Sequence, residues 1–149
     1  MALQLSLPLH GNLSYSGAVT DATITADGAT VSTDGRKGQS CYLFNNTRLV
    51  VQSTQLQNIF ASTTSPFSFA AWIYVDAAEN DRSIIFGNWN ASFFVNWELT
   101  AGCCQVLVAG SNSNYNSKVD TYVIPKTTWT HIVAVYTGSA TKFYVNGVL

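Results

Sequence analysis

Two polar segments combine an aromatic residue with several asparagines. The first segment is Asn88-Trp89-Asn90, and the second contributes Asn112, Asn114, Tyr115 and Asn116. An aromatic ring can cover the apolar C–H face of a sugar, while asparagine amides both donate and accept hydrogen bonds with its hydroxyl groups. We therefore interpret both segments as candidate carbohydrate-binding loops. The alternative is a hydrogen-bonded loop whose tryptophan packs against the edge of a sheet.

A second polar cluster is acidic. Asp76, Glu79 and Asp81 fall in one short turn, together with Asn80. Calcium takes roughly six to eight oxygen ligands, and this turn offers some of them. It is a weak calcium candidate, with a solvated acidic turn as the alternative, and we expect no other cofactor.

The carboxylates do not form a catalytic pattern. A retaining glycosidase needs two carboxyl groups about 5 Å apart, which residues two or four apart on one strand can supply. Glu98 stands alone in its strand-like segment, and the acidic cluster lies in a turn. His131 alternates with Trp129, Val133 and Val135, which favours a structural histidine over a catalytic base. The sequence predicts a protein that is not an enzyme.

The elements that position these residues are short β-prone runs separated by turn-rich gaps. The expected strands are Leu3–Leu7, Ala22–Ala26, Ala29–Thr33, Cys41–Phe44, Arg48–Val51, Phe67–Val75, Ser83–Phe86, Ser92–Leu99, Cys104–Ala109, Val119–Ile124, Trp129–Tyr136 and Thr141–Val145. One helical turn is expected near Leu56–Phe60. Many short strands without a long helix predict an all-β sandwich or barrel.

Phe67–Val75 is the strongest strand in this pattern. Phe67 and every second residue after it place an apolar side chain on one face, while Trp72 and Tyr74 lie on the other. A strand that is apolar on both faces is expected to be central and covered on both sides. Accordingly, we expect Trp72, Trp97 and Trp129 to belong to the core.

Two dipeptides predict tight hairpins. Asp27-Gly28 separates two expected strands, and Asn146-Gly147 follows the strand Thr141–Val145. Such dipeptides favour two-residue hairpin turns. The return strand of the second hairpin would begin at Val148, so we expect a domain that is incomplete at its C-terminal end. Either the sequence belongs to a longer polypeptide, which we favour, or a neighbouring subunit donates the strand.

Charge and composition exclude several classes of partner. Only 10% of the 149 residues are charged, the formal net charge is −1, and the seven lysines and arginines are scattered. Without a basic stripe we expect no nucleic-acid partner. No apolar run approaches the roughly 20 residues of a membrane helix, so we expect no membrane association. The N-terminus lacks the features of a signal peptide, and three cysteines, an odd number, indicate free thiols rather than a disulfide framework.

Two pairs of segments carry a family resemblance. They read Asp34-Gly-Arg-Lys-Gly-Gln-Ser-Cys-Tyr-Leu-Phe44 with Pro66-Phe-Ser-Phe-Ala-Ala-Trp-Ile-Tyr74, and Trp129-Thr-His-Ile-Val-Ala-Val-Tyr-Thr-Gly138 with Lys142-Phe-Tyr-Val-Asn-Gly147. From Leu3 to Leu149 the chain resembles a laminin-G-like domain of the concanavalin A-like lectin/glucanase superfamily. The resemblance implies one domain over residues 1–149, folded as a two-sheet antiparallel jelly-roll sandwich. It also implies binding of glycans or proteins more often than catalysis.

The opening segment Leu7-Pro-Leu-His-Gly-Asn-Leu13 resembles domains in tail and other structural proteins of bacteriophages. This resemblance implies a virion protein, assembled in the host cytoplasm, that binds glycans on a host or environmental surface as an adhesion module. The alternative is a purely structural virion subunit, for capsid decoration or a tail fibre, with protein contacts only. Either role implies a homo-oligomer or a place in a larger assembly of virion proteins.

Overall fold

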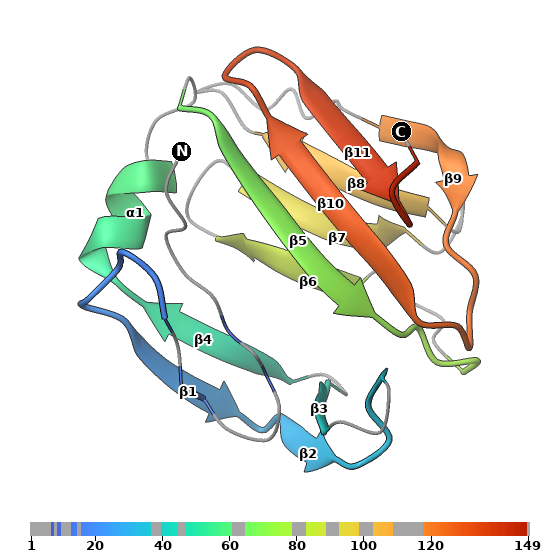
Figure 1. Cartoon of the computed structure of the whole chain (residues 1–149), viewed down its shortest axis with the longest axis horizontal. Helices are drawn as coiled ribbons and strands as arrows, with labels where there is room; N and C mark the ends of the chain where they lie inside the picture. The colour runs from blue at the N-terminus through green and yellow to red at the C-terminus, as the bar shows by residue number, and fades with distance from the viewer. Residues whose placement is uncertain are drawn as a thin grey trace. The chain divides into compact units, whose positions relative to one another are not determined.

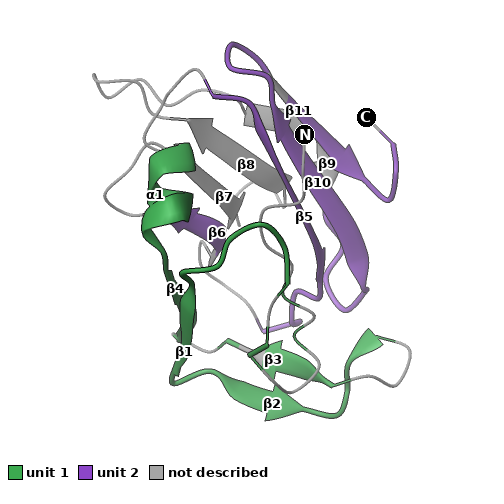
Figure 2. Cartoon of the chain, turned by 60° about the vertical axis from the view of Figure 1, so that its left-hand side comes forward, with its two compact units in different colours: residues 1–59 green, residues 60–149 purple. Residues whose placement is uncertain are grey.

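The computed structural model describes most of the chain as β-strands joined by turns (Figure 1). The described residues are 7, 9, 13–14, 16–36, 40–44, 47–60, 65–78, 83–88, 93–98, 103–108 and 118–148. The chain divides into two compact units, residues 1–59 and residues 60–149 (Figure 2). Among the described residues, no helix is long and apolar enough to cross a membrane.

The first unit contains two small antiparallel strand pairs. Strand β1 (Thr23–Asp27) pairs with β4 (Arg48–Gln52), and β2 (Thr30–Ser32) pairs with β3 (Cys41–Leu43). At the end of the first ladder Arg48 Nε donates a hydrogen bond to Asp27 Oδ2 at 2.9 Å. Helix α1 (Thr54–Phe60) follows β4 directly, and it extends the helical turn expected at Leu56–Phe60 by two residues.

The hairpin expected at Asp27-Gly28 does not form, although strands lie on both sides of it. Gly28 has a positive φ of 78°, whereas Asp27 is not among the residues with positive φ. A type I′ hairpin turn needs positive φ at both central residues. The chain instead bends at Gly28, and β1 takes its partner from β4, whose Leu49, Val50 and Val51 supply larger apolar side chains than β2 does.

The second unit consists of two antiparallel sheets. One contains β5 (Phe67–Ile73), β10 (Thr130–Tyr136) and β11 (Thr141–Val145) in the order β11-β10-β5. The other contains β6 (Ser83–Asn88), β7 (Phe93–Glu98), β8 (Cys103–Val108) and β9 (Lys118–Val123) in that order. Figure 1 shows the first sheet lying in front of the second. The predicted all-β class with antiparallel sheets is confirmed.

The core of this unit lies on one face of the three-stranded sheet. Its buried members are Phe67, Ile124, Ile132, Ala134, Phe143 and Val145. Ile132 of β10 is 0% exposed, and each fully buried aliphatic or aromatic side chain of this kind contributes about 1.5–3 kcal/mol. Phe69 of β5 stacks on Phe86 of β6 with ring centroids 4.5 Å apart, which joins the two sheets. The predicted core face of Phe67–Val75 is therefore confirmed.

Two turns of this unit close hairpins, and the one at Asn146-Gly147 is the turn expected from the sequence. Thr137 N donates to Ala140 O at 2.9 Å between β10 and β11. Asn146 and Gly147 have φ of 51° and 84°, the positive values that a type I′ turn needs. Val145 and Val148 exchange both backbone hydrogen bonds across that turn.

The boundaries of the described strands agree with expectation to within two residues, and the largest differences are at the ends of β5 and β6, at Ile73 instead of Val75 and at Asn88 instead of Phe86. The expected strand Leu3–Leu7 lies outside the described residues except for Leu7. Cys41 is a free, half-buried thiol, and desolvation, with the nearby Asp34 charge, raises its pKa.

Candidate functional site

Most of the carbohydrate-binding residues predicted from sequence lie outside the described residues. These are Trp89, Asn90, Asn112, Asn114, Tyr115 and Asn116. Asn88 is the last residue of β6, and its side chain is likewise outside the description. The prediction that these two loops bind carbohydrate therefore stays a prediction.

The acidic turn is described only at its start. Asp76 Oδ1 accepts a hydrogen bond from Ala78 N at 2.8 Å, so this carboxylate closes the turn after β5. Lys126 Nζ donates to Ala77 O in the same turn at 3.2 Å. Glu79 and Asp81 lie outside the described residues, and so does Asn80. Within the described ranges, no group of three or more histidine, cysteine or acidic side chains could hold a metal ion.

A row of large side chains follows the outer face of the three-stranded sheet, opposite the core. Directly opposed residues of an antiparallel pair share a face. The register places Trp72 of β5 opposite His131 of β10, and Val133 opposite Tyr144 of β11. We call this surface the aromatic face, and its residues are Trp72, Tyr74, Trp129, His131 and Tyr144.

The rings of the aromatic face contact one another in pairs. The Trp72 and His131 ring centroids lie 4.9 Å apart at an interplanar angle of 40°. The Tyr74 and Trp129 centroids lie 5.6 Å apart at 53°. Both distances are typical of favourable aromatic contacts. Each of these four rings therefore contacts a ring from the neighbouring chain segment.

Two of these rings are also well exposed, which corrects the sequence-based expectation for this strand. Trp72 is 44% exposed and Tyr74 is 46% exposed, so the second face of β5 is not covered and Trp72 is not a core residue. In the described part of the structure β5 pairs with β10 alone and lies at the sheet edge. Trp129 is half-buried, and the Trp97 side chain lies outside the description.

A signal for this exposure is present in the sequence. The same face of β5 begins with Ser68 and Ala70, and both residues are exposed. Two small side chains at neighbouring positions of one face offer little apolar area to bury, which is compatible with a face that nothing covers. The pattern of β5 thus resembles a half-covered strand whose outer face carries two large aromatic residues at one end.

Polar groups border the aromatic face on β11. His131 N donates to Asn146 Oδ1 at 3.0 Å, and Asn146 N donates to His131 O at 2.8 Å. The amide oxygen of Asn146 is thereby assigned, which leaves its NH₂ group as a donor. Lys142 lies opposite Val135 and is exposed. Stacking platforms bordered by such donors can hold a sugar ring and bond to its oxygens.

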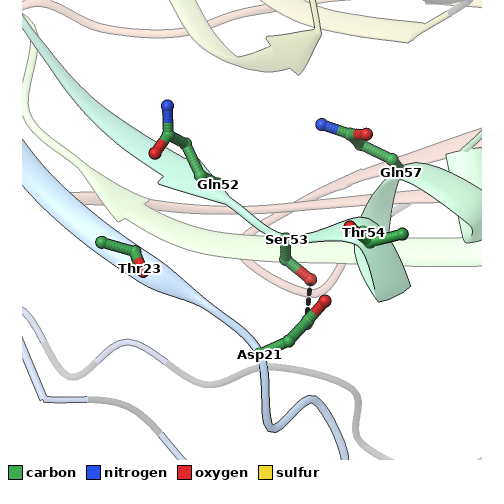
Figure 3. Close-up of a pocket in the computed structure, with 6 residues that line it drawn as sticks. All are labelled: Asp21, Thr23, Gln52, Ser53, Thr54 and Gln57. Atoms are coloured by element: carbon green, nitrogen blue, oxygen red, sulfur yellow. Dashed lines mark hydrogen bonds between the residues drawn. The ribbon is translucent and has the colours of Figure 1, made fainter.

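The first unit contains a separate polar hollow of about 360 Å³. Figure 3 shows its lining, formed by Asp21, Thr23, Gln52, Ser53, Thr54 and Gln57. Ser53 Oγ donates to Asp21 Oδ1 at 2.5 Å and accepts from Leu56 N at 3.0 Å, so Ser53 caps helix α1. Gln55 N donates to Asp21 Oδ2 at 3.1 Å.

These bonds make Asp21 part of the helix cap. The hydrogen bond from the Ser53 hydroxyl is the largest cause that lowers the pKa of the Asp21 carboxyl below its ordinary value. Desolvation is the next largest effect and opposes it, and the backbone N–H groups of Gln55 and Thr54 lower the pKa further. Donors that bond to a carboxylate favour its charged form. Because both carboxylate oxygens already accept hydrogen bonds, we assign this hollow a structural role.

The comparison with known proteins finds a family match that covers the second unit in particular. A family model for the concanavalin A-like lectin/glucanases superfamily matches residues 50–149, which is 100 of the 149 residues. The matched range contains α1 and β5 to β11, including the whole aromatic face. It leaves out the segment 34–44, on which part of the sequence resemblance rested. No curated protein and no solved structure matches the chain.

Proposed function

The chain belongs to the concanavalin A-like lectin/glucanase superfamily, and on that premise we propose that it is a non-catalytic module that binds glycans through its aromatic face. The observation that carries the proposal is the pair of exposed rings, Trp72 and Tyr74, each held by a ring of the next strand. Domains of this superfamily that resemble laminin G are typically binding or adhesion modules.

The chemistry of the face supports binding rather than hydrolysis. Strands β5, β10 and β11 contain no aspartate or glutamate. Hydrolysis by the common glycosidase mechanisms needs two carboxyl groups that flank the scissile bond. Asp76 follows β5, and its carboxylate bonds to the backbone of its own turn.

A glycan array with Trp72→Ala tests the proposal. The wild-type chain should bind a defined set of glycans. The variant should lose about tenfold in affinity, which corresponds to about 1.4 kcal/mol of binding free energy. Because Trp72 is 44% exposed, the variant should keep its fold, which a thermal melt verifies. Phe44→Ala is the matched control: it removes an aromatic ring that is 51% exposed but lies on the first unit.

Two further variants separate the aromatic face from the loops predicted by sequence. Trp89→Ala and Tyr115→Ala should bind as the wild type does if the aromatic face is the site. Loss of binding in these variants, with Trp72→Ala unchanged, would place the site on the loops instead. Adding and removing calcium in the same assay tests the acidic turn that begins at Asp76.

We also propose a setting for this activity, the surface of a bacteriophage particle. Its support is the resemblance of Leu7–Leu13 to segments of phage structural proteins. An antibody raised against the chain should label the outside of purified particles in electron micrographs. Labelled particles combined with a blank glycan array would favour the alternative role, a structural subunit that contacts only other virion proteins.

A further inference from the structure

We infer that the aromatic face selects acidic glycans, which are carbohydrate chains that carry carboxylate or sulfate groups. We assign Lys142 as the residue that binds the negatively charged group. The inference rests on the proposed function and names the ligand class of the same site. It follows from three features of the three-stranded sheet: its charge, its hydrogen-bonding groups and the spacing of both from the stacking rings.

The charge of the sheet has one sign. Lys142 is the only charged residue in β5, β10 and β11, because these strands hold no acidic residue and no other lysine or arginine. Its side chain is exposed on the same face as Tyr144, two residues along β11. Within the described residues Lys142 forms no ion pair, since the pair that occurs there joins Arg48 to Asp27. Its ammonium group is therefore available to an anionic ligand.

The hydrogen-bonding groups around the rings are mainly donors. A lysine ammonium and an indole N–H, here those of Lys142 and Trp129, can only donate. Asn146 Oδ1 accepts a hydrogen bond from His131 N at 3.0 Å, so the group that its side chain can still offer to a ligand is mainly the NH₂ donor. Tyrosine hydroxyls and the imidazole of His131 can act as acceptors, and none of these acceptors is a carboxylate.

This imbalance favours one class of sugar. The hydroxyl groups of a neutral glycan are donors as well as acceptors, and carboxylates are the strongest partners for their O–H groups. The described part of the aromatic face has no carboxylate to offer. Carboxylate and sulfate oxygens on a ligand only accept, so they match Lys142, Asn146 and Trp129, and their bonds to lysine are charge-assisted.

The spacing sets the size of the ligand. Two residues along a strand span about 7 Å, so the row of Trp72 lies about 13 Å along the strands from the row of Lys142. The two residues are also about 10 Å apart across the sheet, because β10 lies between β5 and β11. One sugar ring cannot cover both positions. A ring stacked on Trp72 and an acidic group near Lys142 must therefore belong to different residues of one chain, so the ligand is an oligosaccharide rather than a monosaccharide.

Matched uronic acid probes test the inference. An oligogalacturonate and its fully methyl-esterified form share one carbohydrate backbone and differ in charge. Titration calorimetry with the whole chain should show at least tenfold tighter binding of the charged form, and the preference should shrink as salt is added. Sulfated oligosaccharides and their desulfated counterparts provide the second matched pair, because the acidic group need not be a carboxylate.

Exchanges at Lys142 assign the preference to this residue. Lys142→Gln should weaken binding of the acidic probe about tenfold and leave the neutral probe unchanged, while Lys142→Arg should retain the preference because it keeps the charge. Equal affinity for charged and neutral forms in both pairs, or an unchanged preference in Lys142→Gln, overturns the inference. A folded chain that binds no glycan on any array contradicts the proposed function itself, which is a distinguishable result.

Discussion

Gly28 and Gly147 illustrate two reasons why a position can require glycine, a positive φ and a close neighbour of the missing Cβ. Both have positive φ, 78° and 84°, which other L-residues adopt at a cost of about 1–2 kcal/mol. A Cβ on Gly28 would lie 2.8 Å from Thr47 Cγ2, whereas a Cβ on Gly147 would meet nothing within 4 Å. Gly28 is therefore required by both its backbone conformation and its neighbour.

We predict that Gly28→Ala destabilises the chain by about 2–3 kcal/mol and that Gly147→Ala costs about 1 kcal/mol. Thr47 Cβ also lies 3.4 Å from the added atom, so rotating the Thr47 methyl group away about χ1 relieves only part of the contact. Urea unfolding midpoints of the two variants measure the difference. Equal losses would show that the contact with Thr47 relaxes at little cost.

At the same scale, Trp72 shows why residue type alone predicts burial poorly. Tryptophan within an apolar strand usually packs in a core, and the alternation of Phe67–Val75 correctly identified the core face. The exposure of the second face depends on which strands flank β5 and on what covers them. Those contacts are long-range, and the residues of β5 do not encode them except through the small side chains of Ser68 and Ala70.

At the scale of the element, the N-terminal cap of helix α1 includes a residue that is distant in sequence, Asp21. Ser53 is 5% exposed and links the helix N-terminus to Asp21. The folded pKa of Asp21 is below its unfolded value, so its ionised form stabilises the fold at pH above the unfolded value of about 3.9. That contribution is lost as the pH falls through the folded pKa.

We therefore predict that Asp21→Asn removes part of the acid sensitivity of the chain. Wild-type melting temperature should fall more steeply than that of Asp21→Asn as the pH drops from about 5 towards the folded pKa. Asp34→Asn, which also removes one exposed carboxylate from the first unit, is the control. Its melting temperature should fall with pH as steeply as that of the wild type, because Asp21 is intact. Parallel pH profiles for the wild type and Asp21→Asn would contradict a lowered pKa at this residue.

The two hairpin dipeptides show that local sequence predicts where the chain turns but not which strands pair. Asn146-Gly147 forms the expected turn because both residues adopt positive φ and Val145 can pair with Val148 at once. Asp27-Gly28 bends the chain without a hairpin, because β1 pairs with β4 and β2 pairs with β3 instead of with each other. Turn propensity is a local property, whereas the choice of partner is decided by the apolar surface that each pairing buries.

For the whole molecule, the sequence predicted the all-β class and nearly every described strand, because alternation and turn residues recur along the entire chain. It also predicted the core face of Phe67–Val75, but it assigned Trp72 to the core and did not identify Ile132 or Phe143 as buried. The candidate site was not found, since the aromatic face joins side chains from β5, β10 and β11 that are distant in sequence. Loop composition pointed to other residues, which the described structure leaves untested.

Ile132 provides the test of the second unit's core at this scale. It is 0% exposed and lies in the buried cluster, opposite Ala71 of β5 and Val145 of β11, and we predict that Ile132→Ala costs about 2–5 kcal/mol. All four tryptophans lie in residues 60–149, so their fluorescence reports the unfolding of this unit. Val133→Ala is the matched control, because Val133 is the next residue along β10 and lies on the outer face. It should cost less than about 1.5 kcal/mol, and equal losses at both positions would mean that the buried face does not carry the stability of the sheet.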